Sequence, residues 1–196
     1  MGLNPLAFPF VIDVPLREKR TYVQSASLFD FLVAKTGVNR NISLSFRRKI
    51  ECQMEAVSAE NGTGENYPAR FSGENEHARF DLAIIERQPL KRLERRELYD
   101  EQAVVADSRI EGTSISSESG NGASAIDRIV ALNKRLILQT TAPQKVLIFS
   151  KIFLSTLPSN RAPLTVTLKS RLGLTLFRST VSANGHDVGE IVFYGI

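Results

Sequence analysis

The segment Gly122-Ala123-Ser124-Ala125-Ile126-Asp127-Arg128-Ile129-Val130-Ala131 matches an earlier one, Ser25-Ala26-Ser27-Leu28-Phe29-Asp30-Phe31-Leu32-Val33-Ala34. Five of the aligned positions are identical, and Asp30 falls on Asp127. Both segments carry apolar residues at the spacing of one helix face, so each is predicted to be a helix. The match indicates that the chain consists of two copies of one unit.

The chain has two histidines, and they lie in similar phrases, Asn75-Glu76-His77 and Asn184-Gly185-His186. Each phrase opens a strand-like run near the end of a half of the chain. Together the two matches, found in the same order, predict an internal duplication with units at residues 1–98 and 99–196. Both histidines are expected in hairpin turns, with solvated side chains.

The composition is that of an ordinary globular protein, with 42% hydrophobic and 23% charged residues among 196. No apolar run approaches the roughly 18 residues of a membrane-spanning helix. The first residues lack the charged region and cleavage site of a signal peptide. We therefore expect a cytoplasmic protein that neither enters a membrane nor, with a mild net charge of +4 spread over both halves, binds nucleic acid.

The single cysteine, Cys52, excludes an internal disulfide and a cysteine-based metal site. Its alternation with Ile50 and Met54 predicts that it lies on the apolar face of a strand. No metal and no cofactor are expected.

Alternating apolar residues and turn signals predict mostly strands around the two helices. In the first half we expect a strand, a helix ended by Gly37 and a hairpin near His77. Residues 86–98 are left open between a connecting helix and an edge strand. In the second half the expected order is one strand, a glycine- and serine-rich loop, one helix and four strands, at residues 103–110, 112–122, 123–138, 146–154, 163–169, 174–183 and 187–194.

The second half resembles the hot-dog fold of acyl-thioester enzymes. The resemblance rests on the element order strand, helix, four strands, on the stretch Phe153 to Pro158, and on the hairpin phrase Asn184-Gly185-His186-Asp187-Val188-Gly189-Glu190-Ile191-Val192-Phe193. It implies an α+β protein of two tandem hot-dog-like units, each an antiparallel sheet wrapped round one central helix. Such a double hot-dog would be a monomer that contains its own pseudo-dimer, or a homodimer. Its implied partners are acyl-CoA or an acyl carrier protein.

The resemblance also implies a site, because hot-dog thioesterases and dehydratases usually place an acid in the first turns of the central helix. Asp127 and Asp30 hold that position and would serve as general base or nucleophile. The amides of Gly122 and Ala123 would hold the thioester oxygen, with Glu118 and Asn121 in the lip of the pocket. The simpler interpretation is that an aspartate in a first helical turn only complements the helix dipole.

The histidine positions disfavour a carrier-protein dehydratase, since none precedes the second helix within its half. Thioester hydrolysis needs only an acid and an activated water, so it is the favoured activity. The basic residues Arg92, Arg95 and Arg96 are candidates for docking coenzyme A or a carrier protein, or they are a solvated face.

Two other interpretations remain open. The chain is also similar to chorismate lyases and related ligand-binding domains, in which Arg96 would bind a carboxylate and Glu190 would serve the elimination. The third interpretation is a non-catalytic module that binds an acyl chain or a partner protein.

Overall fold

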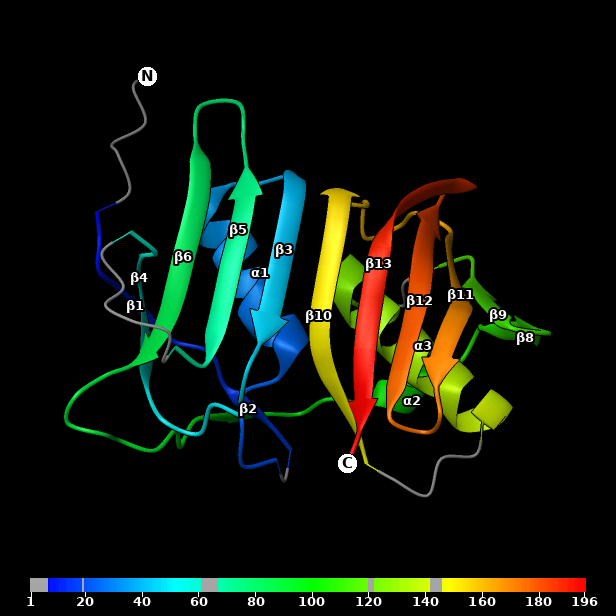
Figure 1. Ribbon diagram of the computed structural model, residues 1–196, viewed down its shortest axis with the longest axis horizontal. Helices are drawn as coiled ribbons and strands as arrows, with labels where there is room; N and C mark the ends of the chain where they lie inside the picture. The colour runs from blue at the N-terminus through cyan, green and yellow to red at the C-terminus, as the bar shows by residue number, and fades with distance from the viewer. Residues whose placement is uncertain (1–6, 19, 61–66, 120–121, 142–145) are drawn as a thin grey trace.

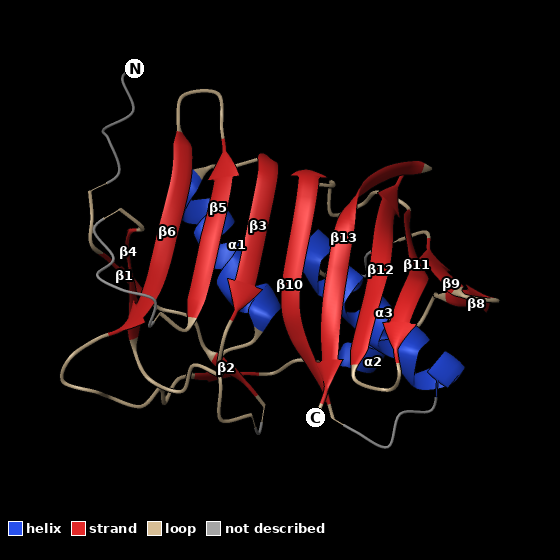
Figure 2. Cartoon of the chain, viewed as in Figure 1, coloured by secondary structure: helices blue, strands red, loops and turns tan. Residues whose placement is uncertain are grey.

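The computed structural model describes residues 7–18, 20–60, 67–119, 122–141 and 146–196. Its core is one eleven-stranded sheet, and the two long helices lie against the same face of it (Figure 1). In most of the longer strands buried residues alternate with more exposed ones, since successive side chains point to opposite faces. Figure 2 shows the resulting two layers, helices on one side and a bare strand face on the other.

The first half holds one of the long helices, α1 (Ser25–Thr36), which buries Leu28, Phe29 and Leu32. Gly37 ends it at a φ of 68°, the left-handed conformation that favours glycine. The strands of this half are β1 (Phe10–Ile12), β2 (Leu16–Arg17), β3 (Arg40–Phe46), β4 (Met54–Ser58), β5 (Ala69–Glu74), β6 (Arg79–Glu86) and β7 (Arg96–Glu97).

The second half is built round α3 (Ala125–Thr141), whose buried side chains include Ile126, Ile129 and Ile137, as the spacing predicts. Val130 is only half-buried. The other elements are α2 (Glu101–Val104), β8 (Arg109–Glu111), β9 (Ser114–Ser117), β10 (Leu147–Thr156), β11 (Leu164–Leu172), β12 (Leu176–Ala183) and β13 (His186–Gly195).

The sheet runs without a break from one half into the other, because β3 and β10 pair antiparallel at its centre. In this register Leu44 lies opposite Ile152, and Ile42 lies opposite Leu154. All four side chains are fully buried. We call this β3–β10 pair the seam.

The order of strands away from the seam differs between the halves. In the second half it is β10-β13-β12-β11-β9-β8, and in the first half it is β3-β5-β6-β4-β1. In the second half the neighbour of the seam strand β10 is β13, the last of the strands β10 to β13. In the first half the neighbour of the seam strand β3 is β5, the third of the strands β3 to β6. There β4 and β5 run parallel on either side of β6, so their connection crosses from one side of β6 to the other.

Three sequence predictions need correction. Of the strand expected at residues 103–110, only residues 109 and 110 lie in a strand, β8, whereas Ala103 and Val104 belong to α2. This helix begins because the carboxylate of Asp100 accepts hydrogen bonds from the backbone amides of Gln102 and Ala103. The loop expected at 112–122 contains β9. Cys52 is half-buried and lies in an isolated bridge with Arg92, since the strand after it begins only at Met54.

For residues 86–98 the sequence does not distinguish a helix from a strand, and the structure shows them extended rather than helical. They include the isolated bridge of Arg92 and end in β7, which pairs in parallel with β2.

Candidate functional site

A cavity of about 360 Å³ lies at one end of the seam, between residues of both halves. The start of α1 forms its floor, and the ends of β3, β10 and β13 form one wall. The middle of α3, β2 and the start of α2 complete it. The charged and polar lining residues include Arg17, Arg20, Tyr22, Gln24, Ser25, Lys49, Tyr99, Glu101, Lys134 and Ser150.

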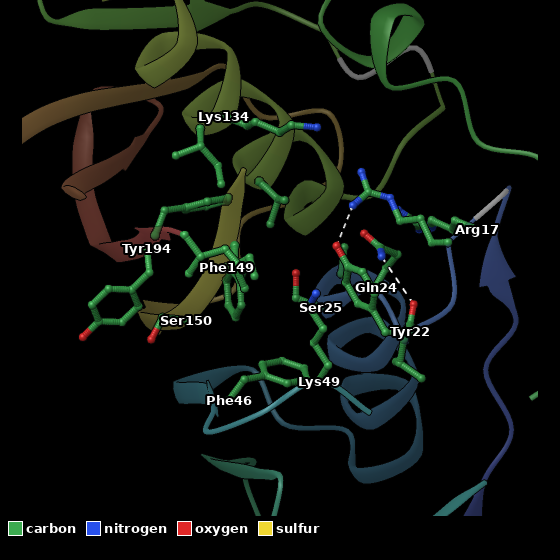
Figure 3. Close-up of a pocket in the computed structure, with 18 of the residues that line it drawn as sticks. Arg17, Tyr22, Gln24, Ser25, Phe46, Lys49, Lys134, Phe149, Ser150 and Tyr194 are labelled. Atoms are coloured by element: carbon green, nitrogen blue, oxygen red, sulfur yellow. Dashed lines mark hydrogen bonds between the residues drawn. The ribbon is translucent and has the colours of Figure 1, made fainter. Parts of the chain in front are cut away.

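One side of the cavity is aromatic. Phe149 packs edge-to-face against Phe46 at 5.8 Å and against Phe193 at 5.9 Å between ring centroids. This chain of rings crosses the seam, since Phe46 belongs to β3 and the other two rings belong to β10 and β13. Figure 3 shows the aromatic side facing Arg17, Tyr22 and Gln24, with Ser25 between them. The cavity therefore has an apolar half and a polar half.

The start of α1 opens into this cavity without a cap. Its N-cap residue, Gln24, makes no capping hydrogen bond with its side chain, and the first turn contains no acid. The first amides of a helix have no intrahelical acceptor and lie at the positive end of its dipole. Ser25 and Ala26, which line the cavity, therefore present a site for a partly negative oxygen.

The charged wall of the cavity holds one carboxylate among its described residues, that of Glu101. Glu101 Oε2 accepts a hydrogen bond from Lys134 Nζ at 2.8 Å and lies 3.7 Å from Arg20 Nη2. The sequence predicts a strand from residue 103 and therefore does not indicate the helix that presents Glu101 to the cavity. The pair Asp100-Glu101, a capping residue before an acid, is the signal that would have found the helix.

Asp127 lies behind the cavity wall and not in it. Both oxygens of its buried carboxylate accept hydrogen bonds from the guanidinium of Arg17, one of them at 3.1 Å. Arg17 also donates from Nε to Glu97 at 3.0 Å and stacks on the ring of Tyr99, with its Cζ 4.0 Å from the centroid. Arg17 lines the cavity, so Asp127 reaches that space only through this arginine.

Asp30 approaches Asp127 across the contact between α1 and α3. Burial raises the pKa of Asp30 to about 6, and the negative charge of Asp127 acts in the same direction. A hydrogen bond with Ser124 and the positive charge of Arg17 oppose that shift. The two aspartates therefore lie near each other, but neither lines the cavity.

The start of α3 is closed by its own neighbours. Ser124 Oγ accepts from the amide of Asp127 at 3.1 Å, and Asn160 Oδ1 accepts from the amide of Ala125 at 2.9 Å. The fully buried Arg128 donates to the carbonyls of Asn160, Ala162 and Ser117. These bonds hold the end of β9 and the loop before β11 against the start of α3. Burial lowers the pKa of Arg128.

The remaining predicted site residues do not line the cavity. Gly122 and Glu118 are exposed, and Ala123 is half-buried. Asn121 lies outside the described residues. The oxygen-binding amides were thus expected at the start of α3, whereas the cavity meets the start of α1, at Ser25 and Ala26, which align with Gly122 and Ala123.

The basic residues proposed for docking lie on β7 and the segment before it. Arg95 pairs with Asp13 at 2.9 Å, Arg96 donates to the backbone carbonyls of Glu18 and Arg20, and Arg92 is exposed. Glu190, the other residue of the lyase interpretation, is exposed on β13. Neither Arg96 nor Glu190 lines the cavity.

Within the described part of the chain, no three acidic, histidine or cysteine side chains gather as a metal site would require. Over the same residues, no helix has the length and apolar character needed to cross a membrane.

No protein-family model matches the chain, and no curated protein is significantly similar to it. Solved structures do match. The tesB protein of Mycobacterium avium subsp. paratuberculosis superposes with a TM-score of 0.53 at 10% identity, over 96% of this chain and 93% of the other. A putative thioesterase from Novosphingobium aromaticivorans gives 0.47 at 9% identity, over 95% and 91%. A hot-dog protein of unknown function from Alicyclobacillus acidocaldarius gives 0.48 at 8% identity, over 90% and 88%.

The chain has the double hot-dog fold, with two helices on one large antiparallel sheet. The expected fold class is thereby confirmed. The superposition supports this fold rather than the chorismate-lyase-like alternative.

Proposed function

We propose that this protein binds an acyl thioester in the seam cavity. The observation that carries the proposal is the meeting of an uncapped helix start with an aromatic wall in one cavity. The acyl group would pack on Phe46, Phe149 and Phe193, where apolar burial is favourable by about 25 cal/mol per Å². The thioester oxygen would accept hydrogen bonds from the amides of Ser25 and Ala26.

Hydrolysis is the second candidate, and the position of Glu101 favours it. This carboxylate would take a proton from water, and the hydroxide oxygen would attack the thioester carbonyl carbon. The carbon–sulfur bond then breaks, and the leaving thiolate takes the proton back from Glu101. Asp127 would act as a positioning residue through Arg17, since both of its oxygens are already engaged. Asp30 would have no contact with the thioester.

Two measurements test these proposals separately. Calorimetric titration with non-hydrolysable thioether analogues of acyl-CoA measures binding, and no saturable binding at any chain length would refute the first proposal. Thiol release from acyl-CoA measures hydrolysis, and Glu101→Gln should lower that rate by roughly 10²- to 10⁴-fold with unchanged analogue affinity. Glu94→Gln, an exposed acid outside the cavity, is the matched control. Binding without thiol release in the wild type would support the non-catalytic acyl-binding interpretation.

We also propose that residues 1–98 and 99–196 are the two duplicated units, and that the chain is a monomer. The seam already supplies the pairing that single units obtain by forming a symmetric dimer. Light scattering at micromolar concentration tests the second statement, and a dimer mass would contradict it.

A further inference from the structure

The wall of the cavity carries more positive than negative charge. Its basic residues are Arg17, Arg20, Arg47, Arg48, Lys49 and Lys134, whereas Glu101 is the one acid among the described lining residues. An excess of one sign in a partly enclosed space raises the local concentration of ligands of the opposite sign.

Several of these cations are already matched by acids. Arg17 is bound by Asp127 and Glu97, and Arg48 pairs with Glu86 at 2.8 Å. Arg20 and Lys134 share the single carboxylate of Glu101. Arg47 stacks on Tyr67 and donates to its hydroxyl at 3.2 Å. Among the other five cations, Lys49 has no acidic partner in the described part of the chain, and Arg20 and Lys134 have one between them.

Two of these cations, Arg20 and Lys49, contact the same residue, Tyr22. Arg20 Nη1 donates to the hydroxyl of Tyr22 at 2.9 Å, and Lys49 Nζ lies 5.0 Å from the centroid of its ring. Tyr22 itself is half-buried, whereas Lys49 is exposed. The group therefore lies where the cavity meets solvent, close to the start of α1.

We propose that Arg20, Tyr22 and Lys49 form a subsite for a phosphate group on the polar arm of the thioester. The proposal rests on the proposed function, because it places the acyl end on the aromatic wall and the phosphate at the opening. A phosphate oxygen replaces part of the contact between Arg20 and Glu101. The nitrogen–oxygen distance of this pair is 3.7 Å, longer than the 2.8 Å between Lys134 and Glu101. Lys134 keeps its hydrogen bond to the carboxylate of Glu101. Two cations and a phenolic hydroxyl match the charge and acceptor atoms of a phosphate.

Phosphate-bearing thioester arms occur in coenzyme A and in carrier proteins, and the chemistry of the subsite is common to both. Calorimetry distinguishes them with thioether analogues of one acyl chain on four carriers: pantetheine, phosphopantetheine, coenzyme A and a carrier protein. We expect the phosphopantetheine analogue to bind at least about tenfold more tightly than the pantetheine analogue. Tighter binding still to coenzyme A or to the carrier protein identifies the source.

The variants Lys49→Ala and Arg20→Gln should each weaken the phosphopantetheine analogue by about fivefold or more and leave the pantetheine analogue unchanged. The control Arg79→Ala removes an exposed arginine outside the cavity and should change neither. Thermal unfolding of each variant shows whether it is folded. Because Lys49 is exposed, its variant tests the subsite even where Arg20→Gln is unstable.

Equal affinity for the pantetheine and phosphopantetheine analogues would overturn the phosphate subsite and leave the proposed function standing. A loss of both affinities to the same extent in Lys49→Ala would also overturn it, since the lysine would then contact the acyl arm. Absence of binding by every analogue would refute the proposed function and the subsite together.

Discussion

The starts of the two central helices hold matching positions in the aligned segments, yet they differ in what surrounds them. At α3 the amide of Ala125 is taken by Asn160, and the buried Arg128 holds the adjoining loops. At α1 the residue before the helix, Gln24, makes no side-chain cap, and the amides of the first turn face a cavity. Capping and ligand binding compete for the same amides. The comparison teaches that a fold with two such helices has two helix starts that could bind a ligand, and that the proposed site uses the one that lacks a side-chain cap.

The largest effect should come from the clamp at α3. Arg128→Ala removes the donors of three backbone carbonyls and leaves a void, so the free energy of unfolding should fall by roughly 3 to 5 kcal/mol in a urea titration. The control on the same helix is Arg135→Ala, since Arg135 donates to one carbonyl, that of Val105. Its loss should be about 1 kcal/mol. Equal losses would mean that the α3 end is not specially held.

The next effect concerns the ion pair behind the cavity. Asp127→Asn leaves the buried Arg17 without its main counter-charge, so unfolding should become easier by about 2 to 4 kcal/mol. The matched control is Asp81→Asn, which breaks the exposed pair of Asp81 with Arg70 and should change stability by less than about 1 kcal/mol. A variant Asp127→Asn as stable as the wild type would show that this carboxylate is free for other chemistry.

Replacement of Asp30 should raise stability, whereas replacement of Asp127 should lower it. Its folded pKa of about 6 lies above its ordinary value of 3.8, so the folded chain binds the proton more tightly than the unfolded chain does. Stability from this group is therefore full below pH 4 and falls as the pH rises through 6. At pH 7.5, Asp30→Asn should raise the free energy of unfolding by about 1 to 2 kcal/mol, after allowance for partial exposure.

The measurement for Asp30 is stability against pH from 4 to 8, compared with the wild type. The difference between the two curves should develop between pH 4 and 6 and then stay constant. A variant that is destabilised at pH 7.5 would show that the ionised carboxylate is needed between the helices.

The smallest effect tests the uncapped helix directly. Gln24→Ser supplies a hydroxyl that can accept from an amide of the first turn of α1, so stability should rise by about 0.5 to 1 kcal/mol. The same bond removes a donor from the cavity, and the affinity for acyl thioether analogues should fall. Gln24→Ala, which offers no acceptor, is the control. If Gln24→Ser gains stability but keeps its affinity, the amides at the start of α1 do not bind the ligand.

The sequence predicted the elements with strong local signals. The four strands of the second half follow from alternation such as Leu164, Val166 and Thr165, and Gly37 marks the end of α1. The two long helices that carry Asp30 and Asp127 also follow from the aligned segments.

The parts that could not be predicted depend on distant contacts. Arg17 and Asp127 are 110 residues apart, and nothing near Arg17 in the sequence indicates a buried partner. The cavity meets the start of α1 and not the start of α3, because residues of loops and strand ends, such as Asn160 and Lys49, surround the two helix starts differently. The exchanged order of β5 and β6 has no local signal, because either order satisfies the same alternation.

That exchanged order constrains how the chain can fold. β5 and β6 form a hairpin of neighbouring residues, whereas β4 precedes both and pairs with the far side of β6. Apart from the three-residue β1, β4 therefore has no strand to pair with until β6 is in place, and β3 adds to the other side of the same hairpin. The seam comes from strands more than 100 residues apart, and such non-local pairings form slowly. Refolding should accordingly be slower than in a helical protein of this length, with the open edge of the β5–β6 hairpin exposed to other chains in the meantime.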